Sequence, residues 1–433
     1  MPQTISRRDY VQIHEAAELL GVSQQTLRNW DKSGKLAARR HPLNGYRLYH
    51  VGDLHAVLNQ IAVPDADREG PPMSEDQLSL FQGMEITAEP AVQPKSVSYE
   101  EDLPPCHWGL SIALDPKHRP QRWTRPSSTV RRDWRKFPQE AHVLDERERK
   151  YRRFTPNEIA VIQGFEAGVV ELEGLTDRQR IAAVGDAVPP PLGRAIASAI
   201  DACWTWENKT ALEYCAGIGG LAEGVAAVGL EHLLLIDHDP VCGRLLASGR
   251  PWLEERVIVG DARTFSYEAF RSKVGLLSGG PPCQPWSQSG RRRGAADERD
   301  LLGQLPEVVA QIAPEVFAFE NVPGLASGEN APYLEDLVAR LRRPDSEHRY
   351  GVMVGVFNAA NYGVPQVRRR LFIVGFRDRP ASDVSRCFDV AAELATHQDP
   401  RIRREGMRVP WRSIGEALEG MRDPGGWRRW ILS

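Results

Sequence analysis

The sequence has no apolar run long enough to cross a membrane and no signal-peptide pattern at its start. Cysteine is scarce, with six among 433 residues, and no two of them form a CxxC pair. Scattered cysteines argue against a disulfide framework and against a zinc module. These absences predict a cytoplasmic protein that uses neither a membrane nor a metal.

An excess of charge of one sign is absent as well. The formal net charge is −3, from 55 basic and 58 acidic residues. Any binding to nucleic acid would therefore have to come from local patches. Arginine runs at 291–293 and 368–370 could provide them, although such a run is more commonly a solvated surface. The length allows two or three domains with at least one large core.

The stretch from Gly279 to Gly294 is the most distinctive part of the chain. An apolar segment, 274–277, precedes it and is typical of a buried parallel strand, which the glycines and prolines then end. Cys283 is therefore expected at the carboxyl end of a strand, where open α/β sheets place their ligands. The loop after it turns basic, which suits a lid over phosphates. A free cysteine is often an inert core residue, so position alone leaves both roles for Cys283 open.

A second strand end carries a glycine-rich turn. The expected strand 212–214 leads into the turn 215–220, and the next strand, 233–236, ends at Asp237. This spacing is typical of nucleotide-binding α/β folds, in which the glycines let a ligand approach the backbone and the acid binds ribose hydroxyls.

Two more acidic residues follow expected strands, Asp261 after 257–260 and Glu320 after 316–319. Because the carboxyl ends of parallel strands meet at one edge of a sheet, these acids, the glycine-rich turn and Cys283 are expected to converge. Taken singly, such an acid is as easily a helix N-cap or a paired carboxylate. If these acids converge with the glycine-rich turn and Cys283, a functional site is favoured over separate structural roles.

Residues 1–62 are expected to form a separate domain. Helical spacing runs from residue 11 to 20, a second helix is expected over 24–31, and Asn44-Gly45 predicts a hairpin. The stretches "TLRNWDKSGKL" and "NGYRLYHVGDL" resemble the winged helix-turn-helix domain of the MerR and excisionase-like family, which implies DNA binding. The alternative is a small helical domain with a protein partner. The expected DNA contacts are Gln24, Gln25, Arg28, Asn29, Tyr46 and Arg47.

Residues 63–100 are rich in proline, acidic residues, glutamine and serine, which predicts a disordered linker. The pentapeptide "QLSLF" interrupts it and resembles the short motif by which bacterial proteins bind the replication sliding clamp. The clamp contacts would be Gln77, Leu78, Leu80 and Phe81. The alternative is a transient hydrophobic spot in a tail.

Six stretches of the α/β region resemble, in order, blocks of the DNA cytosine-C5 methyltransferases. They read "EYCAGIGG", "LIDHD", "VGDA", "GGPPCQPWSQSG", "FENVPGL" and "NYGVPQVRRRLFIVGF". The resemblance implies a Rossmann-like core, S-adenosylmethionine as methyl donor and cytosine in double-stranded DNA as substrate. Two alternatives are a tRNA cytosine methyltransferase and a transcription regulator with an inactive methyltransferase fold. The helix-turn-helix argues against the first, and the intact Cys283 and Glu320 against the second.

The resemblance also implies roles for single residues. Cys283 would add to carbon 6 of a cytosine flipped out of the duplex, while Glu320 would bind N3 and the amine of that ring. Further catalytic contacts are implied for Gln284, Arg368 and Arg370, and contacts with DNA for Ser287, Arg291, Arg292 and Arg293. Donor binding is implied for Cys215, Gly217, Ile218, Gly219, Gly220, Asp237, His238, Asp261, Ala262, Pro282 and Asp186.

The order of the blocks departs from the family. The stretches "RRFTPNEIAVIQGF" and "VGDAVPPPLGRAIASAI" resemble the last two blocks, yet they precede the first. A circular permutation is therefore expected, with the displaced blocks in 151–204 and the catalytic core in 205–378. A small target-recognition lobe would form from 101–150 and 379–433, since permutation is tolerated where the old termini are close and exposed. Cys215 replaces a common aromatic residue and is interpreted as part of the core.

Overall fold

The computed structural model describes residues 10–12, 16, 27, 30–31, 36–40, 47–50, 54, 120–133, 138–248, 250–282, 301–400 and 408–429. The chain divides into two compact units, 1–77 and 78–433, and each is described by itself. Within the described residues, no helix is both long enough and apolar enough to span a bilayer.

Three short strands form a sheet in the N-terminal unit, in the order β1-β3-β2. β3 (Arg47–His50) pairs antiparallel with β1 (Tyr10–Gln12) and with β2 (Arg39–Arg40). The pairing of β2 with β3 confirms the predicted hairpin. The expected helix start at residue 11 is wrong, because Val11 and Gln12 pair with β3 and thereby satisfy their backbone groups. The core of this unit contains Ala16, Leu27, Leu36, Tyr49 and Leu54.

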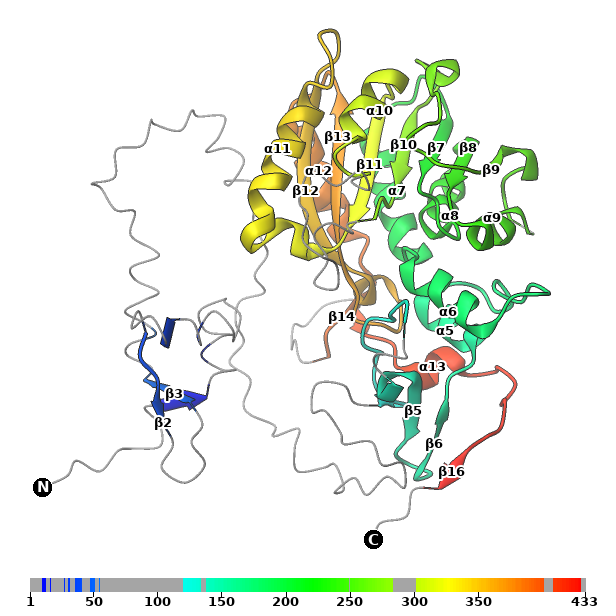
Figure 1. Cartoon of the computed structure of the whole chain (residues 1–433), viewed down its shortest axis with the longest axis vertical. Coiled ribbons are helices and arrows are strands. Elements are labelled where there is room, and N and C mark those ends of the chain that lie inside the picture. Colours follow the sequence, from blue (N-terminus) through cyan, green and yellow to red (C-terminus); the bar gives the residue numbers. More distant parts are fainter. Residues whose placement is uncertain are drawn as a thin grey trace, which may run out of the picture. The chain divides into compact units, whose positions relative to one another are not determined.

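A seven-stranded sheet in the order β12-β13-β11-β10-β7-β8-β9 is the centre of the larger unit (Figure 1). Its strands β11, β10, β7, β8 and β9 are parallel, whereas β13 and β12 are antiparallel to their neighbours. The strands are β7 (Thr210–Tyr214), β8 (Glu231–Asp237), β9 (Val257–Val259), β10 (Leu276–Gly279), β11 (Val316–Asn321), β12 (Tyr350–Asn358) and β13 (Arg369–Arg377).

Helices cover both faces of this sheet. Successive residues of a strand alternate between the faces, so Phe317 and Phe319 pack with α10 and α11, while Val316 and Ala318 pack with α7, α8 and α12. The α-helices of the larger unit are α5 (Pro156–Gln163), α6 (Asp177–Asp186), α7 (Pro190–Cys203), α8 (Gly220–Ala227), α9 (Pro240–Ala247), α10 (Leu305–Ile312), α11 (Ala331–Arg342), α12 (Ala381–Glu393) and α13 (Ile414–Leu418).

A second, small sheet combines two distant parts of the chain, in the order β16-β6-β5-β4. In Figure 1 the C-terminal strand β16 lies beside β6, with which it pairs antiparallel. We call this sheet and α13 the small lobe. Its strands are β4 (Gln121–Arg122), β5 (His142–Asp145), β6 (Lys150–Arg153) and β16 (Arg428–Arg429), and a separate pair is β14 (His397–Gln398) with β15 (Val409–Pro410).

The helix α12 lies outside the small lobe, although the expected lobe included residues from 379 onward. Its apolar side chains Val384, Cys387 and Ala391 are buried with those of α7 and the sheet. This burial places α12 in the layer that covers the large sheet, and the C-terminal part of the small lobe begins beyond it.

Candidate active site

The strand β10 ends at the sheet edge beside Glu320. Its last residue, Gly279, lies between Tyr214 of β7 and Phe319 of β11. A Cβ on Gly279 would lie 2.0 Å from the Tyr214 carbonyl oxygen, and one on Gly280 would lie 3.4 Å from Oε2 of Glu320. Only glycine therefore fits at Gly279, and the chain leaves β10 directly against the Glu320 carboxyl.

The loop that follows is fixed at its base. Nδ2 of Asn321 donates a 3.0 Å hydrogen bond to the carbonyl of Pro281, and Pro282 is half-buried next to it in sequence. Cys283, Gln284, Ser287, Arg291, Arg292 and Arg293 lie outside the described residues. The geometry places the base of the predicted catalytic loop, though not the cysteine itself, at Glu320.

Glu320 and Arg370 form an ion pair at the end of β11. Nε of Arg370 lies 2.7 Å from Oε1 of Glu320, and each side chain is 11% exposed. Antiparallel pairing of β11 with β13 brings them together. Burial raises the pKa of Glu320 above its usual range, and the positive charge of Arg370 opposes the rise. A raised pKa makes such an acid a candidate proton donor to a group bound beside it.

Arg368 is fully buried, whereas the family resemblance implied a catalytic contact for it. Its guanidinium donates to the carbonyl of Val130 at 3.0 Å, and to the carbonyls of Gly185 and Ala187 at 2.8 and 3.1 Å. Burial also lowers the pKa of Arg368. The side chain thus connects the segment after β4 with the end of α6.

The glycine-rich turn joins β7 to α8 with an open outer face. Gly217 and Gly219 have φ values of 56° and 82°, which favour glycine. The backbone N–H of Gly217 donates a 2.7 Å hydrogen bond to Oδ2 of Asp237, and a Cβ on Gly217 would meet no atom within 4 Å. A ligand could therefore approach the backbone here. Gly220 is closely packed, since a Cβ would lie 1.8 Å from the Val188 carbonyl oxygen.

The acidic residues of the neighbouring strand ends lie as the sequence predicted. Asp237 is buried at the end of β8, and the exposed His238 ring has Nδ1 3.5 Å from its Oδ1. Asp261 follows β9 and pairs with Arg263, which lowers the pKa of that carboxyl to about 2. Asp261 is therefore an ionised hydrogen-bond acceptor at neutral pH. Ala262 beside it is buried.

Cys215 and Asp186 lie at the margins of the turn. Burial raises the pKa of the Cys215 thiol well above its usual value, which makes it a poor nucleophile. Ile218 is completely buried. Asp186 pairs with Arg132 at 2.7 Å, with both side chains more than half exposed.

A buried carboxyl group that sequence reasoning missed lies beneath the site. Oγ of Ser278 on β10 donates a short hydrogen bond to Oε2 of Glu213 on β7. Glu213 is 1% exposed, and burial raises its pKa to about 8. The one available signal was an acid within an otherwise apolar strand. Glu213 therefore holds together the two strands that carry the glycine-rich turn and the Cys283 loop.

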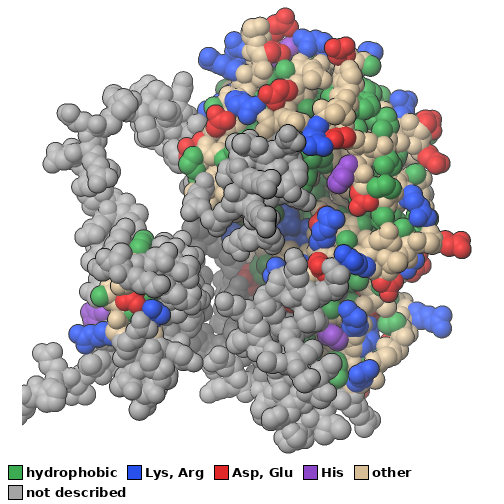
Figure 2. Space-filling model, viewed as in Figure 1, with side chains coloured by type: hydrophobic (Ala, Val, Ile, Leu, Met, Phe, Trp, Pro, Cys, Tyr) green, Lys and Arg blue, Asp and Glu red, His purple; other side chains and the backbone are tan. Residues whose placement is uncertain are grey.

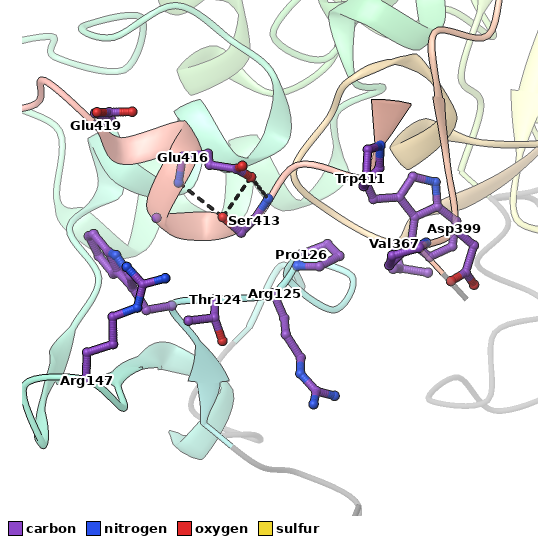
Figure 3. A pocket seen from close by; sticks show the side chains of 14 residues that line it. Thr124, Arg125, Pro126, Arg147, Val367, Asp399, Trp411, Ser413, Glu416 and Glu419 are labelled. Atoms are coloured by element: carbon purple, nitrogen blue, oxygen red, sulfur yellow. Dashed lines mark hydrogen bonds between the residues drawn. The ribbon is translucent and has the colours of Figure 1, made fainter. Parts of the chain in front are cut away.

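An open groove of about 1030 Å³ is lined by residues of the small lobe and by Asp399, Pro400, Pro410 and Trp411. Figure 3 shows Thr124, Arg125 and Pro126 on one side, facing Glu416 of α13 and Ser413, which caps that helix. Val367, two residues before β13, also lines it. Exposed basic residues surround the lobe, and Figure 2 shows Lys and Arg side chains on the same lower part of the larger unit. They include Arg125, Arg147, Arg149, Arg153, Arg422 and Arg428.

In the N-terminal unit, Arg47 is the one predicted DNA contact that is described. Its Nε lies 2.6 Å from Oδ2 of Asp31, and the other oxygen of Asp31 accepts from the backbone N–H of Ala38 at 3.0 Å. This ion pair connects β3 to the helical residue Asp31, and it neutralises part of the Arg47 charge. Gln24, Gln25, Arg28, Asn29 and Tyr46 lie outside the described residues, as do Gln77, Leu78, Leu80 and Phe81 of the clamp motif.

Comparisons with known proteins agree with this arrangement. A family model described as C-5 cytosine-specific DNA methylase matches residues 83–202 and 210–403, and one described as MerR family regulatory protein matches residues 12–49. Type II methyltransferase M.AquIA of Picosynechococcus sp. is 33% identical over 182 residues, which cover 39% of this chain and 73% of that protein. Type II methyltransferase M.NgoMIV of Neisseria gonorrhoeae is 34% identical over 169 residues, covering 39% and 52%.

The alignment thus spans only about half the length of the second relative. Among solved structures, the S. pombe Dnmt2 methyltransferase has 20% identity and a TM-score of 0.31 over 39% of this chain and 50% of that chain. The methylase model, in contrast, matches well over half of the 433 residues. With the α/β sheet and its converging strand ends, this match shows that the chain belongs to the C-5 cytosine-specific DNA methylase family and carries a MerR-like N-terminal region.

Proposed function

We propose that this chain transfers a methyl group from S-adenosylmethionine to carbon 5 of a cytosine in double-stranded DNA. The observation that carries the proposal is the meeting of β10 and β11 at the sheet edge, where Gly280 lies against the Glu320–Arg370 pair. Cys283 follows Gly280 by three residues, within reach of the same place. The family and its Type II methyltransferase relatives favour DNA over tRNA as the substrate.

The sheet edge fits a donor with a nucleoside part. The open face at Gly217 leaves room for a ligand on the backbone, and Asp237 and Asp261 stand at the adjoining strand ends, where ribose hydroxyls and an adenine amine could be bound. S-adenosylmethionine supplies an electrophilic methyl group on a sulfonium. The same residues would hold it beside the base of the Cys283 loop.

The protein's own residues would make carbon 5 nucleophilic. Because a duplex hides the ring, the cytosine has to be flipped out into the site. The Cys283 thiolate then adds to carbon 6, and Glu320 protonates N3 and takes up the charge of the addition. The methyl–sulfur bond of the donor breaks as carbon 5 gains the methyl group, which leaves a neutral thioether. Loss of the carbon-5 proton to a base and of the thiolate, with return of the N3 proton to Glu320, would then restore the aromatic ring and the starting enzyme. Arg370 would orient Glu320 and contact the base.

The chain order supports the proposed circular permutation. Residues of the displaced blocks pack directly on the donor turn, since a Cβ on Gly220 would meet Val188, and one on Gly193 would lie 3.1 Å from the Gly220 carbonyl oxygen. Part of the expected lobe, 121–153, likewise pairs with β16 near the C-terminus. We propose that the small lobe and the groove beside it read the target sequence.

Methyl transfer from tritiated S-adenosylmethionine tests the main proposal. Purified protein should label duplex DNA and leave tRNA unlabelled, and hydrolysis of the product should yield 5-methylcytosine. Cys283→Ser should abolish labelling, while the matched control Cys242→Ser, a buried cysteine of α9, should retain it. Labelling of tRNA alone would favour the alternative substrate, and labelling by Cys283→Ser would reject the mechanism.

The N-terminal unit and the clamp motif are proposed to bring the enzyme to its DNA. The MerR-like region would bind a separate DNA site, and Leu80 and Phe81 would fill an apolar pocket of the sliding clamp. Footprinting before and after removal of residues 1–62 tests the first role, since unchanged protection would reject it. Clamp binding that survives the double substitution Leu80→Ala, Phe81→Ala would reject the second.

A further inference from the structure

Arg250 touches the glycine-rich turn from the side opposite its open face. Its side chain is 5% exposed, although it lies in a loop after α9. One guanidinium nitrogen donates a 2.7 Å hydrogen bond to the carbonyl of Ile218, in the middle of the turn, and another forms a close ion pair with Glu223 in the first turn of α8. Arg250 therefore joins the turn to the helix that follows it.

Aromatic rings close the same side of the turn. The Arg250 guanidinium lies 5.8 Å from the ring centres of both Phe165 and Trp252. A Cβ on Gly219 would come within 2.6 Å of the Trp252 ring. Nε1 of Trp252 donates in turn to the carbonyl of Leu246 at 2.9 Å. Aromatic side chains thus pack around the hydrogen bond from Arg250 to the Ile218 carbonyl.

The turn is consequently held from two directions. Asp237 accepts from the N–H of Gly217 on one side, and Arg250 donates to the carbonyl of Ile218 on the other. Glycine gives a chain much conformational freedom, so a turn with left-handed residues at Gly217 and Gly219 needs such fixed points to keep one shape. A preformed turn lowers the ordering cost of binding a ligand.

We propose that Arg250 is a positioning residue for the methyl donor, and that it fixes the Ile218 carbonyl and the start of α8 so that the turn is preformed for S-adenosylmethionine. This inference rests on the proposed function. It predicts an effect on donor binding in particular, because Arg250 contacts the turn and none of the described residues around Glu320.

Calorimetric titration of the full-length chain with S-adenosylmethionine tests this inference. Arg250→Met should raise the dissociation constant about ten-fold, since a lost hydrogen bond to a charged donor corresponds to roughly that factor. The KM for DNA should remain within about two-fold of the wild type, as expected for a change confined to donor binding. Arg250→Lys, which keeps the charge near Glu223, should recover part of the affinity.

Arg271 offers a matched control. It also donates to one backbone carbonyl, that of Ala310, and pairs with one glutamate, Glu347, but it precedes β10 at the opposite end of the strand. Arg271→Met should leave donor affinity unchanged even if it lowers the melting temperature.

Each outcome has a defined meaning. Wild-type affinity in a folded Arg250→Met variant overturns the inference about Arg250. If that variant does not fold, Arg250→Lys decides: a weaker affinity for the donor supports the inference, and wild-type affinity overturns it. Wild-type protein that binds no S-adenosylmethionine would reject the proposed function itself, which is a separate result.

Discussion

At the scale of single residues, burial and a charged partner shift the pKa values of two acids near the sheet edge in opposite directions. Glu320 is buried beside Arg370, and its pKa is raised despite that positive charge. Asp261 is exposed and bonded to Arg263, so its pKa is lowered to about 2. One site therefore contains an acid suited to donate a proton and an acid suited to accept hydrogen bonds.

Replacing the Glu320 carboxyl by an amide should slow catalysis. Glu320→Gln keeps the size of the side chain but removes the proton that would be given to N3, so kcat should fall about 100-fold or more. Donor binding, measured by titration, should stay unchanged. Glu307→Gln, which removes a carboxylate on the surface of α10, is the control. A kcat within two-fold of the wild type would remove Glu320 from the mechanism.

Glu213 should make stability depend on pH. Its usual pKa is 4.5, and in the folded chain it is about 8, so between these values the unfolded chain loses the proton while the folded chain keeps it. The free energy of unfolding should therefore fall as pH rises through this range, by at most about 1.4 kcal/mol per pH unit from this group. Glu213→Gln removes this contribution.

Urea unfolding of both proteins at pH 5.5 and pH 8 measures the effect. The free energy of unfolding of Glu213→Gln minus that of the wild type should be more positive at pH 8 than at pH 5.5. An equal difference at both pH values would show that Glu213 does not titrate between them.

At the scale of elements, the strand ends were the predictable part of the site. Buried parallel strands such as β11 are continuous apolar runs, and glycine, proline or an acid marks where each one ends. The Thr155–Glu158 capping box likewise marks the start of α5. These are local signals, so the order of strands, turns and acids could be inferred before any contact was known.

Contacts between distant segments were not predictable in the same way. Arg368 bonds to Val130, which is 238 positions away, so its sequence motif gave no sign of burial. Arg250 stands in no recognisable motif, and its role follows only from the packing of α8 and α9 near the turn. α12 was assigned to the wrong layer for the same reason.

The stability of the small lobe should depend on Trp427, which packs the C-terminal segment against β6. Lys150 and Arg152 each lie 4.6 Å from its ring centre, and Trp123 packs edge-on at 6.1 Å. Trp427→Ala should destabilise the larger unit by about 1–3 kcal/mol, because it removes packing at a half-buried position. Affinity for DNA should fall while affinity for S-adenosylmethionine stays within two-fold.

Trp206→Ala is the matched control for that variant. Nε1 of Trp427 donates to Asp423, and Nε1 of Trp206 likewise donates to an aspartate, Asp201, but Trp206 packs beside α7. It should leave DNA affinity unchanged. Equal DNA affinity in wild type and Trp427→Ala would argue against a role of the lobe in binding.

At the scale of the whole molecule, the two compact units divide the proposed tasks. The donor turn, Glu320 and the small lobe all belong to the unit 78–433. Removal of residues 1–77 should therefore preserve the rate of methylation of short duplexes, measured with tritiated donor, and should abolish binding to the separate DNA site proposed for the MerR-like region. Loss of methylation in a folded truncation would show that the N-terminal unit takes part in catalysis.

Covalent trapping on DNA that contains 5-fluorocytosine tests the central claim most directly. Fluorine at carbon 5 cannot leave as a proton does, so the Cys283 adduct should persist after methyl transfer. We expect a complex that is stable in denaturant, requires S-adenosylmethionine, and yields one DNA-linked peptide containing Cys283. A DNA link at another cysteine, or methylation without any trapped complex, would contradict it.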